Sequence, residues 1–183
     1  KDAPLICAIK QTQLSCWKQT NGFWVSDDVA PLLSSDGQAY KHDIKMLQND
    51  DGIIYILFQD LASNSLMLAS NQDSNRENWT VQEVATGTVA YYDLALAGDG
   101  TPRIAANIND QAVYGVPNLD FTQWQFDVID GVATGSGIQL QIGANHEPTV
   151  VYHKGGNLVA GFKNAGKWYL EVIGDVNAAL SSI

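Results

Sequence analysis

The chain has 183 residues, of which 45% are hydrophobic and 16% charged, and its net charge is −10. This composition predicts a globular protein with its own core and excludes a disordered chain, which would be poorer in hydrophobic residues. Only ten Lys and Arg residues are present, which argues against nucleic acid and anionic membranes as partners, and no apolar run approaches the roughly 20 residues of a membrane span.

Strand signals run through the whole chain in the form of period-two alternation, rich in Val, Ile and Tyr and broken by Gly, Asn and Asp turns. The chain begins at Lys1 rather than at methionine, which we interpret as the mark of a processed or excised piece. The first strand is expected at Leu5–Lys10. The pattern then predicts inner strands at 43–47, 93–97 and 139–143. A second strand is predicted after each DG or Pro turn, as at 103–107, and third strands at 14–18, 66–70, 112–116 and 158–162. A fourth strand is predicted to start at each of Trp24, Trp79, Trp124 and Trp168.

These strands belong to four copies of one repeat. Pro4–Trp24 and Pro148–Trp168 align without a gap, and longer copies run over Asp51–Trp79 and Asp99–Trp124. The repeat tryptophans are 55, 45 and 44 residues apart, a period that together with β signals is typical of propeller blades. We therefore predict a single domain over 1–183, with repeats at about 1–40, 41–89, 90–134 and 135–183.

The two ends of the chain complement each other. The first copy lacks an inner strand, and Ala178–Ile183 is an extra strand after the last copy. The sequence predicts an all-β propeller, four blades of four antiparallel strands, with the first blade completed by the C-terminal strand beside Leu5–Lys10. Closure of this kind removes exposed sheet edges.

The segments DGTPRIAA, EPTVVYH, AGKWYLEV and ENWTVQEV resemble β-propeller repeats of the type DGxPxIAY…L…GxWxxExV, which are widespread in secreted and surface proteins. The resemblance covers nearly the whole chain and implies the fold rather than a function, because propellers host lectins, hydrolases, lyases and scaffolds. Fucose-lectin propellers share the general look of the repeat. Their sugar sites use an Arg, a Glu and a Trp in each blade, whereas this chain has only Arg76 and Arg103.

Cys7 and Cys16 are predicted to form a disulfide inside one hairpin. The alignment with the fourth repeat places Gln11-Thr12 in a two-residue loop, where Gly155-Gly156 lies in that repeat, so that Cys7 faces Cys16. Opposed Cα atoms at a non-hydrogen-bonded site are about 4.5 Å apart, which a disulfide accepts. Two reduced, buried cysteines remain the alternative. A disulfide would indicate an oxidising compartment, and we expect a secreted or cell-surface protein.

Two sets of repeated side chains have both a structural and a functional interpretation. The four repeat tryptophans are expected to pack between blades, with stacking platforms as the alternative. An acid before a valine recurs in the fourth strands, where it is expected to protect an edge, with cation binding as the alternative. Polar residues of the inner strands are candidates to line a small channel that holds water or an ion. No spacing of ligands typical of a zinc site occurs, so no metal and no cofactor are predicted. The acids are Asp28, Glu83, Asp127 and Glu171, and the channel residues are His42, Asp43, Asp93 and Gln139.

Aromatic residues outside the repeat template are the candidates for ligand binding: Trp17, Tyr114, Tyr152 and Phe162. Trp17 aligns with Ala69, Gly115 and Gly161, so the repeat does not require an aromatic ring there, although Trp17 can also simply cover its own hairpin. Catalytic motifs such as GxSxG or a P-loop are absent, so enzyme activity stays uncertain and is not favoured.

We expect a non-enzymatic extracellular binding module, with carbohydrate the favoured ligand. The alternatives are a structural or assembly protein that uses the propeller as a protein-interaction platform, and a polysaccharide-degrading propeller enzyme. The predicted partner is thus a glycan or a protein surface, and self-association is left open.

Overall fold

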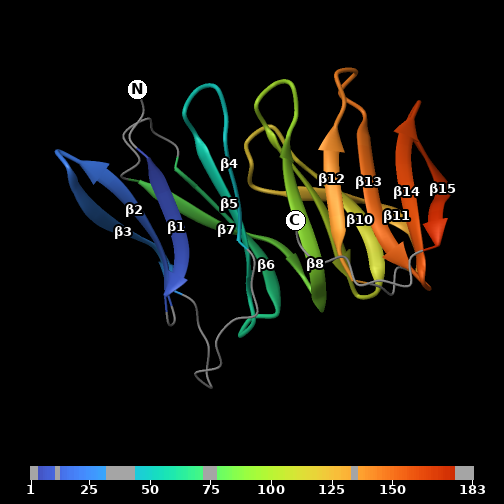
Figure 1. Ribbon diagram of the computed structural model, residues 1–183, viewed down its shortest axis with the longest axis horizontal. Helices are drawn as coiled ribbons and strands as arrows, with labels where there is room; N and C mark the ends of the chain where they lie inside the picture. Colours follow the sequence, from blue (N-terminus) through green and yellow to red (C-terminus); the bar gives the residue numbers. More distant parts are fainter. Residues whose placement is uncertain (1–3, 11–12, 32–43, 72–77, 133–135, 176–183) are drawn as a thin grey trace. The chain divides into compact units, whose positions relative to one another are not determined.

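The computed structural model describes residues 4–10, 13–31, 44–71, 78–132 and 136–175 (Figure 1), and all regular secondary structure in these residues is β-strand. The strands form four antiparallel sheets. The chain divides into two compact units, Lys1–Thr86 and Gly87–Ile183, and each is described by itself.

The first unit contains two sheets. Sheet 1 has three strands, β1 (Leu5–Lys10), β2 (Gln13–Thr20) and β3 (Phe23–Pro31). Sheet 2 has four, in the order β4 (Lys45–Gln48), β5 (Ile54–Asp60), β6 (Ser65–Asn71) and β7 (Trp79–Thr86). The core between them consists of Leu14, Cys16, Val29 and Ala30 from sheet 1 and Ile54, Ile56, Phe58 and Ala69 from sheet 2.

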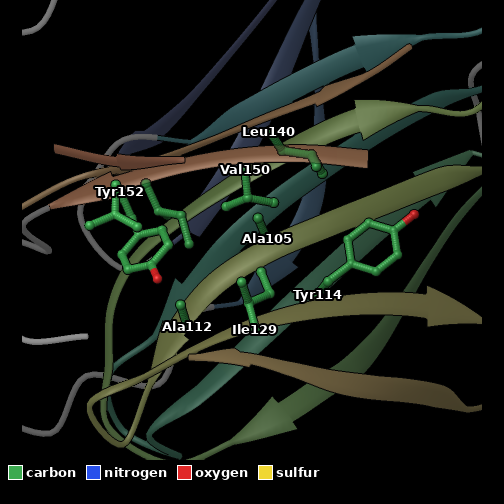
Figure 2. Close-up of a cluster of buried hydrophobic side chains, with 9 residues drawn as sticks. Ala105, Ala112, Tyr114, Ile129, Leu140, Val150 and Tyr152 are labelled. Atoms are coloured by element: carbon green, nitrogen blue, oxygen red, sulfur yellow. The ribbon is translucent and has the colours of Figure 1, made fainter. Parts of the chain in front are cut away.

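The second unit contains two four-stranded sheets (Figure 1). Sheet 3 has β8 (Val89–Leu96), β9 (Pro102–Ile108), β10 (Gln111–Pro117) and β11 (Trp124–Asp130). Sheet 4 has β12 (Ile138–Ile142), β13 (Pro148–Lys154), β14 (Asn157–Asn164) and β15 (Lys167–Asp175). Figure 2 shows their shared core, with Tyr114 at one end and Tyr152 at the other. The core residues are Ala105, Ala112, Tyr114 and Ile129 from sheet 3 and Ile138, Leu140, Val150, Tyr152 and Val159 from sheet 4.

The predicted strands are confirmed to within a few residues. Each fourth strand contains its repeat tryptophan at or next to its first residue. The Gly155-Gly156 turn is a hairpin turn with φ of +56° and +84°, values that glycine adopts without strain. The Ala178–Ile183 strand and the channel residues His42 and Asp43 lie outside the described residues. Ring closure and the single-domain organisation stay predictions.

The disulfide is confirmed. Cys7 lies opposite Cys16 in the β1–β2 ladder, and the two Cα atoms are 4.0 Å apart. Because Cys16 belongs to the core between sheets 1 and 2, the bridge also fills apolar volume there. The register Lys10↔Gln13, Ile9↔Leu14 and Ala8↔Ser15 follows the expectation as well.

A β-bulge recurs at one place in all four sheets, between the last two strands of the sheet. In each sheet one residue of the last strand has no partner in the ladder. These residues are Val29 in sheet 1, Val84 in sheet 2, Ile129 in sheet 3 and Ile173 in sheet 4. Val29, Val84 and Ile129 are only 6–7% exposed, whereas Ile173 is 50% exposed. Ile129 approaches Gly161 of the next sheet so closely that a Cβ there would lie 2.9 Å from its Cγ2 atom.

The bulges correct our interpretation of the repeated acids as one set. Asp28 lies opposite Ser15 and Glu83 opposite Met67, but Asp127 lies opposite Tyr114, one residue further along β10. Glu171 is in register with Asp127 rather than with Asp28. Because successive residues of a strand point to opposite faces, the acids divide into two pairs on opposite faces of their sheets. The prediction that the four acids form one equivalent set is therefore wrong.

The packing role of the repeat tryptophans is confirmed for Trp79 and Trp168, which are partly buried against the two cores. Trp24, which occupies the same position in sheet 1 that Trp168 occupies in sheet 4, is 47% exposed, and its packing between blades stays a prediction.

Candidate functional site

Polar contacts fix sheet 3 against sheet 4 at the Tyr152 end of their core. The carboxylate of Asp130, at the end of β11, accepts hydrogen bonds of 2.7 Å from the Tyr152 hydroxyl and from Lys154 Nζ. Burial of this carboxyl raises its pKa, but the bonds from Lys154, Tyr152 and the Val132 amide outweigh burial and hold the pKa below its usual value. Asp93, one of the predicted inner-strand residues, accepts a 2.8 Å bond from the Leu140 amide and joins β8 to β12.

A second group of side chains lies at the Tyr114 end, and we call it the Lys163 cluster: Arg103, Tyr114, Asp127, Lys163 and Trp168. The rings of Tyr114 on β10 and Trp168 on β15 meet edge to face, with centroids 5.6 Å apart. Lys163 Nζ lies 5.8 Å from the Tyr114 centroid and 5.9 Å from the Trp168 centroid. The ammonium also forms an ion pair with Asp127 on β11. The cluster therefore combines two aromatic rings with both signs of charge across the boundary of sheets 3 and 4.

Arg103 adds a second cation beside Tyr114. Its guanidinium donates a 3.0 Å bond to the Pro102 carbonyl and lies 3.7 Å from the Asp99 carboxylate. Burial raises the pKa of Tyr114, and the nearby Arg103 opposes this only in part. Tyr114 thus keeps its hydroxyl proton at neutral pH and is available as both donor and acceptor.

The polar atoms of the Lys163 cluster differ in accessibility. The side chain of Asp127 is 39% exposed and that of Lys163 19%, while Tyr114 is buried. The Trp168 indole Nε1 is buried and has no hydrogen-bond acceptor among the described residues. The Nε1 atoms of Trp79 and Trp124 are buried in the same way, so this is a feature of the repeat rather than of the cluster. Chemically, the cluster offers aromatic surface, cationic donors and one carboxylate acceptor.

The three predicted ligand-binding aromatics of the second unit do not come together. Tyr114 belongs to the Lys163 cluster, whereas Tyr152 is 2% exposed and bonded to Asp130 at the other end of the core. Phe162 stacks on Tyr169 on the face of sheet 4 that points away from sheet 3. Trp17 lies in the first unit, opposite Ile6.

Lys163 and its contact with Asp127 were not expected from the sequence. The two residues are 36 positions apart and belong to different sheets. Asp127 was included only as one of the repeated acids, and nothing in the local pattern marks Lys163. The available signal was weak: aligned with the first repeat, Lys163 takes the place of Gln19, so the cation is not a feature of the repeat.

The described residues contain no group of three or more His, Cys, Asp or Glu side chains placed to hold a metal ion. Among the same residues, there is no helix with the length and apolarity required to cross a bilayer.

No family model matches the chain, and a search of curated proteins gave no match either. Solved structures do resemble it. They include a bifunctional GH43-CE protein of Bacteroides eggerthii (TM-score 0.52, 13% identity, 94% of this chain and 28% of that one) and the NanB sialidase of Streptococcus pneumoniae (TM-score 0.52, 14% identity, 94% and 29%). A third is a triple arginine-to-alanine mutant of AofleA from Arthrobotrys oligospora (TM-score 0.51, 12% identity, 92% and 56%).

The chain spans between about a quarter and just over half of the length of these three structures. At 12–14% identity the likeness is one of fold alone. Together with the four antiparallel sheets and the absence of helix from the described residues, the comparisons show that this chain has an all-β, propeller-like fold.

Proposed function

We propose that the protein is a non-enzymatic extracellular carbohydrate-binding module and that the Lys163 cluster is its binding site. The observation that carries the proposal is the meeting of Tyr114, Trp168, Lys163 and Asp127 at one boundary between two sheets.

The chemistry of a sugar matches this group of side chains. A pyranose has an apolar face of C–H groups, which suits an aromatic ring, and a rim of hydroxyls that both donate and accept. Lys163 supplies donors and Asp127 supplies acceptors. A ligand with neighbouring hydroxyls can satisfy both at once.

The solved structures with a similar fold support the ligand class. One of them is a sialidase and another carries the GH43 designation, so the fold is used by proteins that act on carbohydrate. The disulfide is consistent with an oxidising compartment, and we propose secretion or the cell surface as the location.

Two other functions compete with this proposal. A polysaccharide-degrading enzyme would release reducing ends from its substrate. An assembly protein would present its surfaces to protein partners. Neither alternative is favoured by a contact within the Lys163 cluster, where the carboxylate Asp127 is engaged by Lys163.

A glycan array followed by titration of the best ligand tests the proposal. Lys163→Met removes the charged donor and is expected to weaken binding about tenfold or more, because a hydrogen bond to a charged group contributes about 1.5–3 kcal/mol. Lys167→Met, the same change at an exposed lysine four residues away, is the matched control and should bind normally. An array without a bound glycan, or equal binding by both variants, would refute the proposal, and sugar release during incubation would favour the enzyme.

A further inference from the structure

The charged side chains of the Lys163 cluster are arranged as pairs of opposite sign. Lys163 on β14 forms its ion pair with Asp127 on β11. Arg103 on β9 lies 3.7 Å from the carboxylate of Asp99, in the loop that leads into the same strand. Bonds from the Thr101 hydroxyl and amide hold the pKa of Asp99 below its usual value, so this carboxylate is ionised at neutral pH. Each of the two cations therefore already has a carboxylate as its partner.

A third carboxylate gives the cluster an excess of negative charge. Glu147, the residue before β13, lies close enough to Tyr114 to raise its pKa, as Asp127 does. Tyr114 itself is neutral at pH 7, because burial raises its pKa. Three carboxylates thus face two cations around one uncharged ring. The chain as a whole has a net charge of −10, which adds to the negative potential at the cluster.

The other two lysines of sheet 4 do not change this balance. Lys167 precedes Trp168 on β15, and successive residues of a strand point to opposite faces, so Lys167 lies on the face away from sheet 3. Lys154 is bonded to Asp130 at the other end of the core. The excess of carboxylates over cations therefore persists in the immediate surroundings of the cluster.

The carboxylates are also more accessible than the cations. The side chain of Asp127 is 39% exposed and that of Lys163 19%. The same order holds for Asp99 and Arg103, at 62% and 16%. A ligand that approaches the cluster therefore meets oxygen acceptors before nitrogen donors. A sugar hydroxyl can donate to such a carboxylate and accept from the neighbouring ammonium, whereas a ligand carboxylate can only accept and is repelled by the like charge.

We propose that the Lys163 cluster binds uncharged sugars and discriminates against acidic ones, such as hexuronates and sialylated glycans. This inference rests on the proposed function and specifies its ligand class. Asp127 has two roles in it, because the same carboxylate accepts a hydrogen bond from a neutral sugar and repels a ligand that carries its own negative charge. Discrimination between similar ligands commonly requires such a repulsive element beside the attractive ones.

A glycan array of matched pairs tests the inference. The probes are oligosaccharides of neutral hexoses beside the same oligosaccharides with the corresponding hexuronates, and glycans with and without a terminal sialic acid. The native chain is expected to bind the neutral member of a pair at least about tenfold more tightly. The buffer has low salt, because salt screens the repulsion. A pH of about 8 keeps histidine ordinarily uncharged, since His146 packs on Gly98 beside Asp99.

Asp127→Asn tests whether this carboxylate causes the discrimination. The amide keeps the size of the side chain and one acceptor oxygen, but it removes the charge and leaves Lys163 without its ion-pair partner. The ratio of neutral to acidic binding is therefore expected to fall toward one. Asp110→Asn, the same change of charge in the exposed turn between β9 and β10, is the matched control and should keep the native ratio. Each ratio compares two ligands on one variant, so a loss of folded protein cancels.

The outcomes separate this inference from the proposed function. Acidic glycans that bind as tightly as their neutral counterparts would overturn the inference and leave the proposed function standing. An array on which neither class binds would refute both. A ratio that is unchanged in Asp127→Asn, or that falls equally in Asp110→Asn, would show that the discrimination does not arise at the cluster and would overturn the inference as well.

Discussion

Tyr152→Phe removes one hydroxyl from the contact between sheets 3 and 4 and keeps the aromatic ring. The lost bond joins a nearly fully buried side chain to the Asp130 carboxylate at 2.7 Å. A hydrogen bond to a charged group contributes about 1.5–3 kcal/mol. Asp130 keeps its bonds from Lys154 and the Val132 amide, so the cost should lie near the lower end, at about 2 kcal/mol. For a chain of this size that corresponds to a midpoint about 4–8 °C lower.

The effect of Tyr152→Phe should also depend on pH. The pKa of Asp130 in the folded protein lies below its usual value, so its contribution is present above the pKa of the unfolded chain and is lost as pH falls through the folded pKa. The native protein and the variant should therefore differ fully at neutral pH and progressively less below about pH 4.

Urea unfolding followed by tryptophan fluorescence at neutral and acid pH measures both effects. Tyr91→Phe, at a partly exposed tyrosine of β8, is the control and should change the free energy of unfolding by less than about 0.5 kcal/mol. If the two variants lose the same stability, or if the loss for Tyr152→Phe grows in acid, the buried charged bond does not stabilise the unit.

Three further substitutions test the packing. Gly161→Ala should cost about 1–3 kcal/mol in thermal unfolding because its Cβ would crowd Ile129 and Leu170, whereas Gly131→Ala, with open space around it, should be nearly neutral. Replacing Cys7 and Cys16 by serine should lower the free energy of unfolding by about 2.5 kcal/mol, the value for a closed loop of this length. Intact-mass measurement of the freshly isolated native protein tests the bridge itself, and two free thiols would contradict it. Trp168→Ala should cost about 3–5 kcal/mol of stability, whereas Trp17→Ala should leave the melting temperature within a few degrees; equal destabilisation by the two would refute this division.

The regular features of the fold were predictable because they repeat. Gap-free alignment of Pro4–Trp24 with Pro148–Trp168 was sufficient to place the hairpin, its register and the disulfide, since each depends only on counting residues outward from a two-residue turn. The strands starting at the repeat tryptophans followed from the same alignment.

The bulges and the site were not predictable in the same way. A bulge changes which face a residue points to without leaving a mark in the sequence, and for this reason Asp28 and Asp127 were wrongly placed in one set. The contact of Lys163 with Asp127 depends on how two sheets pack rather than on the pattern of either.

The bulge also gives each sheet a direction. In sheet 3 it lets two consecutive residues, Ile129 and Asp130, point the same way, so that an apolar projection and a charged anchor address one neighbour together. The face of sheet 4 that meets sheet 3 offers the complementary recess, at Gly161. The two faces of such a sheet are therefore not interchangeable, and a repeat can be inserted beside another one in a single orientation only.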